Sequence, residues 1–144
     1  MGAVEGQPLL TSNQWQQVER GGEGAIKRWI DTQMAGKSCL VVLIGNQTAG
    51  RRWVKYEIKK AWDDGKGVVG VYIHGLKNLL QVQDTKGRNP FDDFTLGTGT
   101  NQRRLSAIVK AYDPPYTIST SVYNHIKTNL ASWVEEAIQI RTRY

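Results

Sequence analysis

The chain of 144 residues has little of the chemistry that most cofactor and metal sites use. It contains one cysteine, Cys39, and two histidines, His74 and His125. A single cysteine excludes an internal disulfide and favours a reducing compartment such as the cytoplasm. These three residues have no metal-ligand spacing, and no Ser-His-Asp arrangement stands out, so we expect no metal site.

Long apolar runs and charge runs are also absent. The longest uncharged apolar run, residues 39–44, is far shorter than the roughly 20 residues that a membrane-spanning helix needs. Neither a Gly-x-Gly-x-x-Gly motif nor a Walker loop is present. The formal net charge is +6, but the basic residues are scattered along the chain. We therefore expect no membrane partner and keep nucleic acid only as the weakest of three hypotheses.

The apolar residues that are present predict an α/β domain spanning residues 1–144. Two glycine-bounded apolar runs, residues 38–45 and 68–74, are typical of parallel strands covered on both faces. Helical spacing predicts helices at residues 23–35, 51–64 and 121–141. A third, short strand is expected at 107–111, after a long irregular insertion over 75–105 with one helical turn near 76–80. Strand, helix and strand in this order indicate a right-handed crossover.

The predicted sheet is narrow for such a domain. Doubly wound folds usually have about five strands, and this chain offers three. Residues 1–22 are predicted to be irregular, with one weak helical turn and no strand. An apolar strand edge without a partner would favour association with another copy of the chain.

The sharpest local feature is the segment Arg51-Arg52-Trp53-Val54-Lys55-Tyr56-Glu57. Trp53 and Glu57 are spaced to share a helix face, just beyond the carboxyl end of a buried strand, where open α/β sheets bind ligands. A carboxylate there, beside an aromatic ring and two arginines, could serve an anionic substrate. The spacing alone is weak, since Trp15 and Glu19 repeat it. From the residues alone, a structural Glu57 is the first interpretation, and a catalytic one stays open beside it.

A resemblance sharpens this hypothesis. Residues 42–45, 51–58 and 70–74, together with 86–91, resemble the TIR-like proteins of the Thoeris antiphage defence system, over roughly residues 2–91. The resemblance implies a flavodoxin-like fold. It also implies an NAD-cleaving enzyme, without a further cofactor, that releases nicotinamide and makes a cyclic ADP-ribose signal for a separate effector protein. In that family the catalytic glutamate lies in a Trp-x-x-x-Glu helix, and the matching residue is Glu57.

One carboxylate is chemically sufficient for such a reaction. Nicotinamide leaves from a cationic ring, so the oxocarbenium-like ribose needs charge stabilisation more than a general acid. Trp53 would pack structurally or stack on nicotinamide, and Arg51 and Arg52 would meet phosphates or remain solvated. The loop residues Asn46, Gln47 and Thr48, and His74 at a strand end, are the remaining candidates for substrate binding.

Family members begin with a strand and a helix ahead of the segment that matches Gly2. We therefore expect this chain to lack that first strand and helix, which would limit its activity alone. Two other functions stay open beside the enzyme: a catalytically silent TIR module for self-association or nucleotide binding, and a basic nucleic-acid binder.

Overall fold

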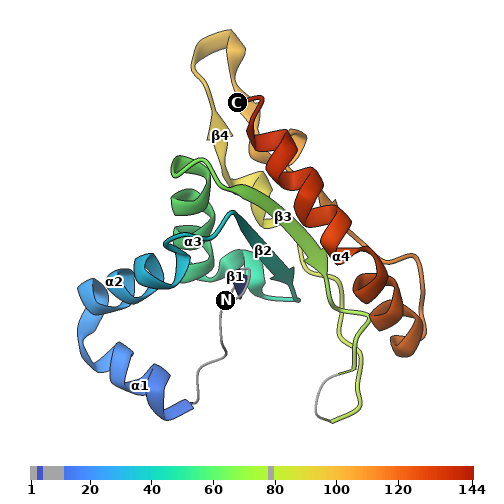
Figure 1. Ribbon diagram of the computed structural model, residues 1–144. Coiled ribbons are helices and arrows are strands. Elements are labelled where there is room, and N and C mark those ends of the chain that lie inside the picture. The colour runs from blue at the N-terminus through green and yellow to red at the C-terminus, as the bar shows by residue number, and fades with distance from the viewer. Residues whose placement is uncertain (1–2, 5–11, 78–79) are drawn as a thin grey trace.

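The central feature of the computed structural model, which describes residues 3–4, 12–77 and 80–144, is a four-stranded sheet (Figure 1). The strands β1 (Ala3–Val4), β2 (Cys39–Ile44), β3 (Gly67–Tyr72) and β6 (Ala111–Tyr112) lie in the order β1-β2-β3-β6. β2, β3 and β6 are parallel, and β1 pairs antiparallel with β2. The predicted α/β fold with a parallel sheet is confirmed.

Helices cover both faces of this sheet. Those described are α1 (Ser12–Arg20), α2 (Gly22–Met34), α3 (Arg52–Asp63) and α4 (Ser119–Arg141). In Figure 1, α4 runs along one face, and α2 and α3 lie on the other side. A small hairpin of β4 (Thr95–Leu96) and β5 (Arg103–Arg104) extends beside the C-terminus. Within the described ranges, no helix has the length and hydropathy needed to cross a lipid bilayer.

Alternation along the strands builds two separate cores. Successive side chains of a strand point to opposite faces. Leu40, Val42 and Ile44 of β2 therefore pack toward α2 and α3 in one buried cluster. Cys39 and Val41 pack in a second cluster with residues of α4, which include Trp133, Val134 and Ala137. This two-sided burial explains why β2 and β3 are apolar almost throughout.

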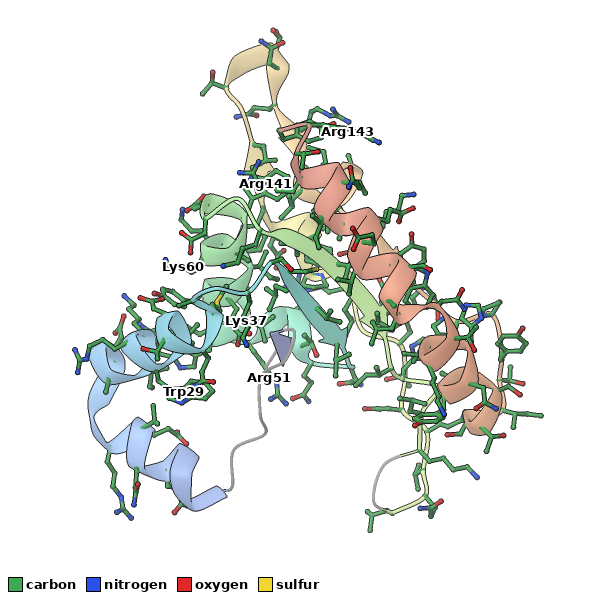
Figure 2. The ribbon with its side chains drawn as sticks, viewed as in Figure 1. Trp29, Lys37, Arg51, Lys60, Arg141 and Arg143 are labelled. Atoms are coloured by element: carbon green, nitrogen blue, oxygen red, sulfur yellow. The ribbon has the colours of Figure 1, made fainter. Side chains whose placement is uncertain are left out.

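The C-terminal part of α4 is fixed against β3 and α3. A Cβ placed on Gly67 would lie 2.7 Å from the backbone nitrogen of Ile138, so glycine allows the strand to approach the helix backbone closely. Arg141 Nη2 donates to the carbonyl oxygen of Trp62 at 2.9 Å, and its guanidinium lies 4.3 Å from that indole ring. Figure 2 shows Arg141 at the end of α4 that faces Lys60 and the end of α3.

The N-terminal region differs from the prediction, which was wrong in assigning it no strand and only one helical turn. Ala3 pairs with Val41 and Val4 with Leu40, which covers part of the β2 edge. A two-residue strand has no periodicity, so only the neighbouring strand reveals it. α1 is a nine-residue helix. Its Gln, Glu and Arg residues are good helix formers, although they provide few apolar positions.

The third strand also differs from its prediction. Residues 105–107 form a 3-10 helix instead of entering a strand, and β6 contains only Ala111 and Tyr112. Ile108 and Val109 are buried without strand pairing, because their backbone N–H groups bond back to the carbonyl of Leu105. The apolar residues predicted a strand because they are buried, although they do not pair with a neighbouring strand. The helical turn expected at 76–80 includes residues 78–79, which lie outside the described residues.

Candidate functional site

Polar side chains gather where the three parallel strands end. Asn46 and Thr48 follow β2, His74 follows β3, and Asp113 follows β6. The carboxyl ends of parallel strands meet at one edge of a sheet, which is where α/β folds bind ligands. The fold therefore places these residues at the sheet edge where a site is expected.

Thr48 holds the turn between β2 and α3 in place. Its side chain is buried, and its Oγ1 accepts a hydrogen bond from the Gly45 N–H at 2.8 Å. The same hydroxyl donates to the Leu43 carbonyl at 3.3 Å. A short 3-10 helix, Thr48–Gly50, then leads into α3. Both hydrogen bonds of the Thr48 hydroxyl are therefore used to hold this turn, which gives the residue a structural role.

We expect Thr48→Val to destabilise the protein by about 1–3 kcal/mol, the usual cost of unpaired buried polar groups. The substitution keeps the shape of the side chain but leaves the Gly45 N–H and the Leu43 carbonyl without their partner. Urea unfolding measures the change. Thr48→Ser is the matched control and should keep most of the stability. Equal stability of the valine variant would contradict this role.

The segment of residues 84–88 connects the ends of β2 and β3. Asn46 Nδ2 donates to Thr85 Oγ1 at 2.7 Å, and the Asp84 N–H donates to the His74 carbonyl at 3.0 Å. Gly87 is buried against the carbonyl of Gly45, where a Cβ would lie only 2.1 Å from that oxygen. Sequence reasoning noticed only residues 86–91, and by resemblance alone, since a contact between residues 39 positions apart leaves no local signal.

His74 lies in a charged and aromatic cluster. Its Nε2 is 3.9 Å from Asp113 Oδ1, and Lys86 Nζ is 3.1 Å from Asp113 Oδ2. Lys86 also lies 4.6 Å from the centre of the Tyr72 ring, which meets His74 edge-on. The buried Nδ1 of His74 has no hydrogen-bond partner among the described residues. The sequence prediction missed Asp113. A strand predicted at 111–112 would have identified this carboxylate as the residue that follows a strand end.

Glu57 is a buried carboxylic acid. Its side chain is 4% exposed, and its Oε1 has no hydrogen-bond partner in the described part of the chain. Removal from water disfavours the charged form, so burial raises the pKa of Glu57 to about 8. A buried acid without a partner costs stability. Such groups are concentrated at functional sites, where their perturbed pKa serves chemistry.

The remaining predicted residues on α3 point toward α2. Arg52 forms an ion pair with Glu23 and lies 4.8 Å from the Trp53 ring, which meets Tyr56 edge-on at 5.9 Å. Tyr56 Oη donates to Asp31 Oδ1 at 2.7 Å. Its pKa is raised to about 12 by burial and by this carboxylate. Arg52 and Tyr56 thus join α3 to α2, and Trp53 packs against the buried cluster that α2 and α3 share.

Arg51 precedes α3 and is exposed, with its side chain projecting outward in Figure 2. Gln47 is likewise exposed, at the start of the turn. No hydrogen bond or ion pair between described residues joins Arg51, Arg52 or Trp53 to the strand-end group of Asn46 and His74. The structure therefore brings together one part of the predicted set and leaves the arginines apart from it.

Across the described ranges, no cluster of three or more His, Cys, Asp or Glu side chains is placed to hold a metal ion.

The match to a known protein family covers this same region. The family model described as "Thoeris protein ThsB, TIR-like domain" matches residues 2–78, slightly more than half of the chain. A Bacillus cereus (strain MSX-D12) protein named "Putative cyclic ADP-D-ribose synthase ThsB1" is 38% identical over 84 residues. That alignment covers 58% of this chain and 44% of the relative, so it spans less than half of the relative's length. Glu57 and every other predicted site residue lie within residues 2–78.

Proposed function

This chain belongs to the TIR-like domain family of the Thoeris protein ThsB, and from that premise we propose that it cleaves NAD and produces a cyclic ADP-ribose-type signal. The name of the Bacillus cereus relative supports the choice of product. The observation that carries the proposal is the buried carboxyl group of Glu57 on the helix that follows β2, with an Oε1 that has no hydrogen-bond partner among the described residues.

Glu57 would act on the bond between nicotinamide and ribose. As this bond breaks, its electron pair goes to the cationic nicotinamide ring, which leaves as a neutral molecule, and positive charge develops on the ribose. An ionised carboxylate stabilises that charge, most strongly where water is excluded. Attack on the ribose carbon by a second nucleophilic atom of the same molecule, with loss of a proton, then closes a cyclic product.

The raised pKa of Glu57 is compatible with this role. In the ligand-free protein the carboxyl group is mostly protonated at neutral pH, because its pKa is about 8. A cationic nicotinamide ring placed beside it favours the ionised form and lowers the pKa. NAD would therefore bring the positive charge that makes the carboxylate available.

Other residues would position the substrate in this proposal. Asn46 and His74 would offer hydrogen bonds at the strand ends, and Thr48 would support the turn beneath them. Arg51, which has no acidic partner among the described residues, is better placed for a phosphate than Arg52, which Glu23 already neutralises. Trp53 would act through its packing against the buried cluster that α2 and α3 share.

We propose that the chain forms one TIR-like domain, acts in the cytoplasm, and signals to a separate effector protein through its product. The test is to incubate the 144-residue chain with NAD and to separate nicotinamide and ADP-ribose products by chromatography. Stoichiometric release of nicotinamide supports the proposal. NAD that remains intact, in a sample that is folded by circular dichroism, would favour the catalytically silent TIR module.

A further inference from the structure

A cleft lies away from Glu57, at the beginning of α4. It has a volume of about 370 Å³, within the range of small-molecule sites, and is lined by Tyr116, Ser121, Asn124, His125, Thr128 and Asn129. In Figure 1, this end of α4 lies beside the loop that follows β3. Hydrogen bonds from the Lys77 N–H to Ser119 Oγ, and from Gln83 Nε2 to the Thr117 carbonyl, join the loop to the helix.

Two rings of the lining, Tyr116 and His125, continue a column of aromatic rings that begins in the core. Trp133 stacks on Tyr112 at 4.4 Å with an interplanar angle of 7°. His125 lies 5.6 Å from Trp133, and Tyr116 lies 5.5 Å from His125 at the mouth. Asn129 fixes the histidine segment, since its Nδ2 donates to the His125 carbonyl at 2.8 Å. The rings are thus held in position before any ligand arrives.

The polar lining selects the class of ligand. Two amides and two hydroxyls surround the rings, and none of the side chains that line this cleft is permanently charged. Amide and hydroxyl groups match the donor and acceptor edge of a neutral heterocycle, and aromatic side chains bind its faces by stacking. Tyr116 is half-exposed, so part of its ring surface is accessible to a ligand.

A neighbouring cleft adds a positive charge. It has a volume of about 420 Å³, shares Asn124 with the first cleft, and is lined also by Lys77 and Tyr123. Lys77 has no acidic partner among the described residues, so its ammonium group can meet an anion. A flat polar ring in the first cleft and a phosphate toward Lys77 would fill both.

We propose that this pair of clefts binds a nucleoside or nucleotide, with the base against Tyr116 and His125 and any phosphate directed toward Lys77. The site is separate from Glu57 and goes beyond NAD cleavage. The aromatic cleft fits the base of a nucleoside and that of a nucleotide equally well. The two ligands are therefore tested separately.

The experiment is calorimetric titration of the whole chain with adenosine, with adenosine monophosphate and with ribose. We expect saturable binding of adenosine, tighter binding of the monophosphate, and none of ribose. Tyr116→Ala should weaken adenosine binding at least about fivefold, because base stacking is lost. Tyr116→Phe keeps the ring and should bind within twofold of the parent, and Tyr123→Ala is a control in the neighbouring cleft.

Lys77→Ala should reduce the affinity for the monophosphate to that for adenosine and leave adenosine binding unchanged. Glu57→Gln should leave both affinities unchanged, which separates this site from NAD cleavage. The absence of saturable binding, equal binding of ribose and adenosine, or unchanged binding by the folded Tyr116→Ala variant would each overturn the proposal.

Discussion

Glu57→Gln is expected to lower NAD cleavage by a factor of about 100 or more, the effect of removing one contact to a charge that develops in the transition state. Glutamine has nearly the same shape as glutamate but carries no charge. The helix and its packing should therefore survive, while the ribose cation loses its stabilising group. Activity that requires the ionised carboxylate should also rise with pH toward the ligand-free pKa of about 8.

The same substitution should stabilise the protein in alkaline solution. The folded-state pKa of Glu57 is about 8, whereas an unfolded glutamate titrates near its model value of 4.5. Between these two pH values the folded state binds a proton that the unfolded state releases, so the free energy of unfolding falls as pH rises. The penalty is complete above pH 8 and absent below pH 4.5. Glu57→Gln should recover about 1–3 kcal/mol at pH 8, because the buried amide still has a polar cost.

Nicotinamide release and urea unfolding at pH 5 and pH 8 measure the two effects on one protein sample. Glu19→Gln is the matched control, because Glu19 repeats the Trp-x-x-x-Glu spacing on an exposed face of α1. It should change neither quantity. Activity of the Glu57 variant within twofold of the parent would remove Glu57 from the mechanism, and a loss of stability at pH 8 would contradict the burial argument.

Gly87→Ala should disrupt the strand-end group and lower both stability and NAD cleavage. The added Cβ would lie 2.1 Å from the Gly45 carbonyl oxygen and 3.1 Å from the Asn46 Cα. These are backbone atoms that cannot rotate away, so the segment must shift. Overpacking of this kind costs about 1–3 kcal/mol. The shift would pull Thr85 from Asn46, and misplacement of substrate-binding groups by about 1 Å can cost up to about 100-fold in rate.

Gly50→Ala is a suitable control for this prediction. A Cβ on Gly50 would meet no atom within 4 Å, although this residue belongs to the turn between β2 and α3 that Gly87 contacts at Gly45. Calorimetric melting and nicotinamide release of both variants would be compared with the parent. A Gly87→Ala protein that melts and reacts like the Gly50→Ala protein would show that the contact at Gly45 positions nothing.

Much of the fold could be predicted from the sequence because its signals are local. Glycine-bounded apolar runs predicted β2 and β3, and the helical periodicity of 3.6 residues predicted α2, α3 and the long α4, all to within a few residues. The restricted backbone of proline favours a turn at Asp113-Pro114-Pro115, and there the Tyr116 N–H donates to the Pro114 carbonyl. The position of Glu57 after a buried strand marked it as a candidate before any contact was known.

The sequence by itself determined the α/β class, the main helices and the residue types available for chemistry, because periodicity and composition are written along the chain. Only the tertiary structure decided that Ala3–Val4 pairs with β2, that residues 84–88 join Asn46 to His74, and that Asp113 reaches Lys86. It also decided that Glu57 is buried, which raises its pKa. Pairing partners, burial and charge neighbours depend on residues far apart in the chain, so they exist only after the chain has folded.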